Sequence, residues 1–251
     1  MSGHNKWASI KHKKAITDAK KGKAFTKIIR EIVVATKEGG ALIENNARLR
    51  KAIDDAKEAN MPQDNIKKAI QRGSGEIPGA IYEEMVYEGY GPAGVALIVE
   101  ATTDNKNRTA SEIRKMFSSH NGNLGETGCV GWMFEKKGYI VVDKSAADEE
   151  TLMNIALESG AEDFRSKPDM DVYEVITSAS DLDNVKNALK EKNIVTLSAE
   201  ISMIPQTYIK LTGDDASSMI KLMDGLEEHD DVKNVYSNFD ISKEEMEKID
   251  A

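Results

Sequence analysis

"GSGEIPGA", residues 73–80, places three glycines and one proline in eight consecutive positions. Gly and Pro at this density are typical of a connection between structural parts, because neither residue supports a continuing helix or strand. The spacing of apolar residues also changes here, from a helical period before the stretch to an alternating period after it. The sequence therefore predicts a helical part that ends near residue 78 and a mixed part that follows it.

The helical part shows three amphipathic segments. Asn46 is suited to cap the second segment, and Pro62 suits the first turn of the third, which Gly73 is expected to end. The first segment should end at Gly39-Gly40, and its apolar face comprises Phe25, Ile28, Ile29, Ile32 and Val33. We predict a small helical bundle.

The mixed part alternates strands and helices. Residues 137–204 predict the order strand, helix, strand, strand, helix, strand, which is the ferredoxin-like arrangement. The flanking segments predict a second unit of this kind, with strands at 95–101, 130–135, 206–211 and 232–239. A single continuous mixed sheet is the alternative.

Two strands carry the clearest patterns. "VALIV" (95–99) is apolar throughout, so we expect a central strand that is covered on both faces. Residues 195–203 alternate, which predicts a half-buried strand whose inward face comprises Val195, Leu197, Ala199, Ile201 and Met203.

The predicted fold class is therefore a multidomain α+β protein, with a helical bundle and two ferredoxin-like domains, one inserted in the other. The predicted domains are a basic helical domain at 1–78, an outer α+β domain at 79–136 with 205–241, an inserted α+β domain at 137–204 and a C-terminal tail at 242–251.

The charge is distributed unevenly. The chain of 251 residues has a net charge of −9, yet residues 1–79 hold 17 Lys and Arg against 9 Asp and Glu, a net charge of +8. The remaining residues have a net charge of −17. Such asymmetry indicates a basic module for an anionic partner, although basic runs are also common on solvated surfaces.

The basic residues concentrate between Gly3 and Ile32, where nine cations accompany two acids. A helix face of like charges repels itself, and a polyanion relieves that repulsion by releasing counterions as its phosphates are neutralised. Trp7 and His12 could stack on bases, although Trp7 suits a core position equally well. The candidate nucleic-acid-binding residues are Lys6, Trp7, Lys11, His12, Lys13, Lys14, Lys20, Lys21, Lys23, Lys27 and Arg30.

Other motifs favour structural roles. The glycine-rich stretches 87–95 and 121–132 lack the spacing of a phosphate-binding loop, so we interpret them as turns, the second also as a possible contact surface. Residues 102–109, "TTDNKNRT", follow the central strand and should cap the next helix, which leaves Asp104, Asn107, Arg108 and Thr109 as polar groups of interest. A helix-turn-helix with Gln63, Asn65, Lys68 and Arg72 on its reading helix is a weaker hypothesis than an ordinary bundle.

The sequence predicts no catalytic residues, metal ligands or cofactor. Cys129, the only cysteine, and His120 lack a third orienting group, so a buried thiol is expected. The four histidines have no metal-ligand spacing. The absence of an internal disulfide fits a reducing compartment, and the predicted location is cytoplasmic.

Several long motifs resemble the YebC/PmpR family of probable transcriptional regulatory proteins, and the resemblance covers nearly the whole chain. They are "SGHNKWASIKHKK", "GKAFTKIIREI", "NMPQDNIKKAI", "YEGYGPAGVALIVEATTDNKNRT" and "GNLGETGCVGWMFE". The resemblance implies a helical N-terminal domain followed by two α+β domains. It also implies DNA binding at promoters, or a role in translation such as that of the mitochondrial translational activator of cytochrome c oxidase subunit I. It supplies no catalytic residues.

We therefore predict a non-enzymatic, nucleic-acid-binding regulator of gene expression that acts as a DNA-binding transcriptional regulator. The alternative is a ribosome-associated translation factor that binds ribosomal RNA. The expected partner is duplex DNA or ribosomal RNA, without a membrane or a small-molecule substrate.

Overall fold

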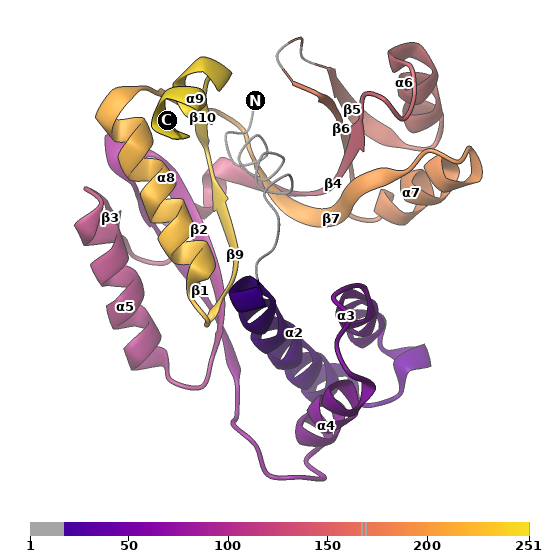
Figure 1. The fold of residues 1–251 in the computed structure, drawn as a ribbon, viewed down its shortest axis with the longest axis vertical. Helices are drawn as coiled ribbons and strands as arrows, with labels where there is room; N and C mark the ends of the chain where they lie inside the picture. The colour runs from indigo at the N-terminus through magenta and orange to yellow at the C-terminus, as the bar shows by residue number, and fades with distance from the viewer. Residues whose placement is uncertain (1–17, 167, 169, 251) are drawn as a thin grey trace. The chain divides into compact units, whose positions relative to one another are not determined.

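The computed structural model describes residues 18–166, 168 and 170–250, which form two compact units. The first unit contains residues 18–131 and 211–237. The second unit contains residues 132–210, apart from 167 and 169, and residues 238–250. The described chain begins with helices and continues with strands of antiparallel sheets and further helices between them (Figure 1), so the predicted multidomain α+β class is confirmed. The finer domain boundaries given above stay a prediction.

The first unit begins with the predicted helices. They are α2 (Asp18–Gly39), α3 (Ala47–Glu58) and α4 (Gln63–Ser74), with a short 3-10 helix at Ile43–Asn45. Apolar residues at helical spacing form a shared core that contains Ile32, Val33, Ala35, Leu49, Ala52, Ile53, Ala56, Met61, Ile66 and Ala69. The amphipathic pattern thus predicted both the helices and the faces that they bury.

Asn46 connects α2 to α3. Its Oδ1 accepts the Leu49 N–H at 2.9 Å, which is the predicted N-cap. Its Nδ2 also donates to the carbonyls of Ala35 at 2.7 Å and Gly40 at 2.9 Å. The buried amide therefore caps one helix and satisfies carbonyl groups at the end of the other.

The sequence predicted that Gly73 would end α4, and this prediction is wrong. The helix continues to Ser74, and Gly75, with φ of +82°, provides the left-handed residue that ends it. Gly73 instead lies against α2, where an added Cβ would be 2.6 Å from both the Thr36 Cβ and the Val33 carbonyl oxygen. This glycine allows two helices to approach closely.

The sheet of the first unit has the strand order β3-β1-β2-β9. Its strands are β1 (Glu83–Tyr90), β2 (Ala96–Thr103), β3 (Asn123–Leu124) and β9 (Val232–Ser237), and all pairs are antiparallel. Helices α5 (Lys106–Ser119) and α8 (Gly213–Glu228) lie side by side along it (Figure 1). Residues 95–99 are buried and β2 is central, as predicted.

Two of the strands predicted for this sheet, at 130–135 and 206–211, do not belong to it. Residues Gly131–Met133 form a 3-10 helix, and Phe134 begins a strand of the second unit. Ile209–Leu211 forms β8, which pairs with β10 (Phe239–Ile241) in a separate small sheet. Val130, Trp132 and Phe134 alternate with other residues as in a strand, but the chain passes between units here, and Trp132 is 68% exposed. The β1–β2 hairpin occupies the centre of the sheet, so its strand order is not ferredoxin-like.

The second unit does have the predicted ferredoxin-like order. Strands β4 (Phe134–Asp143), β5 (Ala161–Ser166), β6 (Val172–Thr177) and β7 (Thr196–Pro205) form an antiparallel sheet in the order β5-β6-β4-β7. Helices α6 (Glu149–Glu158) and α7 (Leu182–Glu191) bury Leu152, Ala156, Leu182, Val185 and Leu189 against it. The C-terminal tail contains one further helix, α9 (Lys243–Asp250).

The inward face predicted for β7 is only partly correct. Val195, Leu197 and Ile201 are 73%, 53% and 39% exposed. β7 is an edge strand, and its register with β4 shifts opposite Val141 and Val142. The edge and this irregularity leave apolar side chains uncovered although the alternation is regular.

We expect the substitution Asn46→Ala to lower the free energy of unfolding by about 3 kcal/mol, because it removes three hydrogen bonds from a buried site. Urea unfolding followed by circular dichroism measures the loss. The control is Asp148→Ala, which removes the exposed cap of α6 and one bond to the Thr151 N–H. An Asn46 variant no less stable than this control would contradict the connecting role.

Candidate nucleic-acid interface

One face of α2 packs against the C-terminal end of α8. Lys23 Nζ donates to the Glu228 carbonyl at 3.2 Å, and Lys27 Nζ donates to the Glu227 carbonyl at 2.6 Å. Arg30 Nη1 donates to the Asp230 carbonyl at 2.5 Å. The last carbonyls of a helix lack partners within it and carry partial negative charge, so Lys23 and Lys27 stabilise the end of α8, while Arg30 contacts the turn that follows it.

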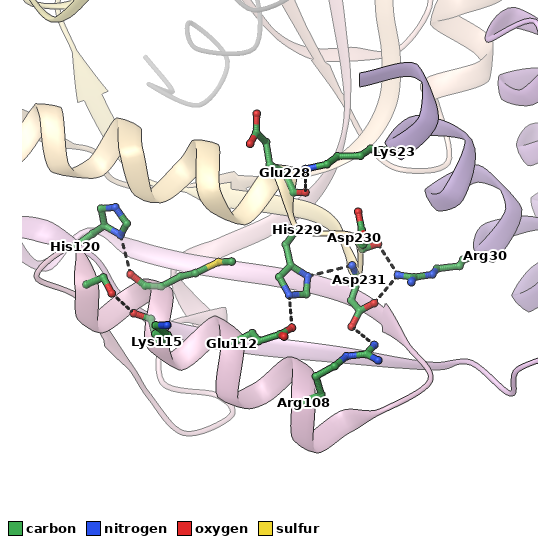
Figure 2. A pocket seen from close by; sticks show the side chains of 12 residues that line it. Lys23, Arg30, Arg108, Glu112, Lys115, His120, Glu228, His229, Asp230 and Asp231 are labelled. Carbon is green, nitrogen blue, oxygen red and sulfur yellow. Dashed lines mark hydrogen bonds and ion pairs between the residues drawn. The ribbon is translucent and has the colours of Figure 1, made fainter. Parts of the chain in front are cut away.

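Asp231 lies at the centre of this contact (Figure 2). Its carboxylate accepts hydrogen bonds from Arg30 Nη1 at 2.6 Å and from Arg108 Nη2 at 2.8 Å. The hydroxyls of Thr109, at 2.5 Å, and Thr103, at 3.1 Å, donate to the same carboxylate. The Asp231 side chain is 2% exposed and that of Arg30 is 13% exposed. The two arginines thus compensate a carboxylate that would otherwise be costly to bury.

The electrostatics of Asp231 follow from these contacts. Burial by itself would raise its pKa, but the hydrogen bonds from Thr109 and Arg108 and the charges of Arg30 and Arg108 outweigh burial and lower the pKa from 3.8 to about 2. The same contact raises the pKa of Arg108. Asp231 therefore remains charged throughout the physiological range.

The stretch 102–109 supplies the other half of the network. Asn105 Oδ1 accepts the Arg108 N–H at 3.1 Å, which caps α5. Asp104 Oδ1 accepts a hydrogen bond from Arg108 Nη2 at 2.9 Å, four residues away along the chain. Of the polar groups of interest in this motif, Arg108 and Thr109 form hydrogen bonds to Asp231. Both residues lie in the first turn of α5, whose start is fixed by the Asn105 cap.

A second ion-pair cluster joins the helices to the sheet. Arg48 of α3 contacts Glu31 of α2 at 2.7 Å and Glu84 of β1 at 2.5 Å. Lys233 of β9 contacts Glu31 at 2.9 Å. Burial favours a higher pKa for Glu31, but Arg48 and Lys233 lower it. In addition, the Arg30 guanidinium lies over the Tyr82 ring, 5.5 Å from its centroid.

A cleft of about 650 Å³ lies beside Asp231, between α2, α5 and the turn that joins α8 to β9 (Figure 2). On its floor, His229 Nε2 lies 2.9 Å from the Glu112 carboxylate, and His229 Nδ1 lies 3.1 Å from the Asp231 backbone nitrogen. Since a backbone N–H can only donate, Nδ1 accepts, and the neutral ring carries its proton on Nε2 and donates it to Glu112.

Glu112, His229 and Asp231 bring three potential metal ligands within 4.8 Å of one another. However, both Asp231 oxygens already accept hydrogen bonds from arginine, and Nδ1 of His229 accepts a backbone N–H. The chemistry of this donor set therefore fits an internal hydrogen-bond network better than a metal site.

The second glycine-rich stretch is held by Glu88. The carboxylate accepts the N–H groups of Gly128 at 2.8 Å, Val130 at 2.8 Å and Gly131 at 2.7 Å. Burial opposes the charge of Glu88, but these three donors lower its pKa. The bonds fix the loop on β1, which agrees with the interpretation of this stretch as turn structure.

The predicted site residues fall into three groups. Lys6, Trp7, Lys11, His12, Lys13 and Lys14 lie outside the described residues. Lys20 and Lys21 lie in the first turns of α2. Lys23, Lys27 and Arg30 follow at helical spacing. Lys23 and Lys27 contact the last residues of α8, and Arg30 contacts the turn between α8 and β9.

Sequence reasoning missed Asp231, Glu88 and the anchoring role of Arg30. Asp231 lies in the run "EEHDD", which is typical of a solvated helix end. The only signal was the pairing of an acidic helix end with a basic helix elsewhere in the chain. Charge alone does not specify which acid is buried.

The fold and these contacts define a class: an α+β protein in which a cation-rich helix is anchored to a sheet domain by buried ion pairs. The chain belongs to the TACO1/YebC family. Residues 5–76 match the family's model of the "TACO1/YebC protein N-terminal domain", and residues 82–239 match that of the "TACO1/YebC second and third domain". The resemblance to YebC is thereby confirmed.

Relatives match over almost their full length. A protein of Endomicrobium trichonymphae is 79% identical over 100% of both chains, and one of Elusimicrobium minutum is 57% identical over 99% of both. Each is named "Probable transcriptional regulatory protein". The crystal structure of a conserved hypothetical protein from Aquifex aeolicus superposes with a TM-score of 0.80 at 47% identity, covering 90% of this chain and 93% of that one. None of the described helices has the length and apolar character needed to cross a bilayer.

We expect Asp231→Asn to lower the free energy of unfolding by about 3 kcal/mol at pH 7, because the substitution leaves the largely buried Arg30 without its carboxylate and leaves Arg108 with Asp104 alone. The pKa of Asp231 is lower in the folded protein than in the unfolded chain, so its contribution is present above pH 4 and is lost as the pH falls toward 2. Urea unfolding at several pH values tests this. The difference between wild type and variant should shrink between pH 4 and 2, and a constant difference would contradict the assigned charge.

Proposed function

We propose that this protein is a non-enzymatic regulator of gene expression that binds duplex DNA through the basic segment that includes the start of α2. The observation that carries the proposal is the concentration of nine cations and two acids between Gly3 and Ile32, in a chain whose net charge is −9. A phosphate backbone neutralises such a segment and releases counterions. The names of the relatives, "Probable transcriptional regulatory protein", support a role in transcription.

The contacts of α2 support a division of roles along the segment. Lys27 and Arg30 hold the helix on the end of α8 and on the turn that follows it. Lys23 also bonds the Glu228 carbonyl, but it is exposed and lines the cleft. We assign phosphate binding to the cations that precede Lys27 and Arg30. These are Lys6, Lys11, Lys13, Lys14, Lys20, Lys21 and Lys23, with Trp7 and His12 available to stack on bases or pack on the sugar-phosphate backbone.

Ribosomal RNA is the second candidate ligand. Eight of the nine cations in the segment are lysines, and lysine is a point charge that contacts phosphate without the bidentate geometry by which arginine reads bases. Backbone and shape recognition of folded RNA uses the same chemistry. A translation factor of this kind would bind ribosomes in preference to promoter fragments.

The test is the triple substitution Lys11→Gln, Lys13→Gln and Lys14→Gln, measured by fluorescence anisotropy with a promoter-length DNA duplex over a range of salt. With about six phosphates contacted, the logarithm of the wild-type affinity should fall against the logarithm of salt with a slope of about −5. The variant should bind about 100-fold more weakly at about 0.15 M salt, with a slope of about −2.

The matched control is Lys186→Gln, Lys190→Gln and Lys192→Gln, which removes three exposed lysines at and after α7. This control should bind like the wild type. Equal binding by the triple variant and the control would refute the basic segment as the site. Ribosome co-sedimentation of the same preparations distinguishes the candidates, since tight ribosome binding without duplex binding would favour the RNA alternative.

A further inference from the structure

Helix α5 is an exception within the acidic part of the chain. Residues 80–251 have a net charge of −17, yet α5 carries Lys106, Arg108, Arg114 and Lys115 against a single acid, Glu112. A solvent-exposed helix in an acidic body would be expected to share the prevailing charge. Among the described helices after residue 80, α5 alone has a net positive charge.

The charged groups of α5 fall into two sets. Lys106 pairs with Glu83 at 2.6 Å, Arg108 pairs with Asp231, and Glu112 bonds His229. Arg114 and Lys115 are exposed, and neither makes an ion pair with any residue that the structure describes. Glu112, the one acid of the helix, is thus bonded to His229, whereas Arg114 and Lys115 are exposed to solvent.

The cleft beside Asp231 connects these cations to α2. Lys23 of α2 and Lys115 of α5 both line it, from its two sides (Figure 2). Four acids line the cleft. Asp231 pairs with two arginines and Glu112 bonds His229. Glu228 and Asp230 are exposed, and they accept the hydrogen bonds of Lys23 and Arg30 through their backbone carbonyls. Lys115 is thus a cation on the α5 side of the cleft, and Arg114 is its neighbour along the helix.

We propose that Arg114 and Lys115 form a second phosphate-contacting surface, which binds the backbone of the same DNA duplex that the basic segment binds. This inference rests on the proposed function and adds two phosphate contacts on α5 to those of the basic segment. Two exposed cations without carboxylate partners contact phosphates without first breaking an ion pair. Each contact releases about 0.9 of a counterion from duplex DNA.

The test is the double substitution Arg114→Gln and Lys115→Gln, measured by fluorescence anisotropy with the promoter-length DNA duplex used above. The salt slope should become less steep by about 1.8, and affinity at about 0.15 M salt should fall about 30-fold. Each single substitution should give about half of the change in slope. Arg114→Lys, which keeps the charge, should bind like the wild type, and circular dichroism should confirm that every variant is folded.

The matched control is Lys186→Gln with Lys190→Gln, two exposed lysines of α7. If the wild type binds the duplex and the α5 variant binds like this control, the inference is wrong and the proposed function stands. If the wild type itself fails to bind the duplex, both the proposed function and this inference are wrong. A loss confined to a ribosomal RNA fragment, with duplex affinity unchanged, would also overturn the assignment to duplex DNA.

Discussion

The buried carboxylate of Asp231 is the constraint on which the first unit depends. A charge that is 2% exposed is stable only when it is paired, and its partners come from α2, from the end of β2 and from the first turn of α5. The network therefore fixes three elements that are far apart in the sequence around the turn between α8 and β9. Four side chains donate hydrogen bonds to this carboxylate and together compensate the cost of its burial: Arg30, Arg108, Thr103 and Thr109.

The network also explains why an acidic protein carries a basic helix. The last carbonyls of α8 and the Asp231 carboxylate attract one face of α2, so part of the positive charge is used inside the protein. We infer that anchoring and ligand binding are separated along the same segment, with the anchor at Lys27 and Arg30. A rigid anchor reduces the conformational entropy that is lost when the rest of the segment binds a polyanion.

The amino-acid sequence predicted the features that depend on local pattern. Helical spacing gave the faces of α2, α3 and α4, and the Asn46 cap followed from the preference of asparagine for that position. Features that depend on long-range contacts were missed. Gly73 looks like a helix stop until α2 lies against it, and Trp132 looks like a strand residue until the chain passes between units. Asp231 lies in an acidic run, and only the fold selects it for burial. The candidate site on residues 6–14 still depends on charge pattern.

A double-mutant cycle between Arg30→Met and Asp231→Asn tests the anchoring of α2 most directly. The free energies of unfolding of the wild type, both single variants and the double variant are measured in urea at pH 7. If the pair holds α2 on the α8–β9 turn, the two substitutions should be coupled by about 2 kcal/mol. Effects that add to within about 0.5 kcal/mol would mean that the two side chains act independently and would contradict this account.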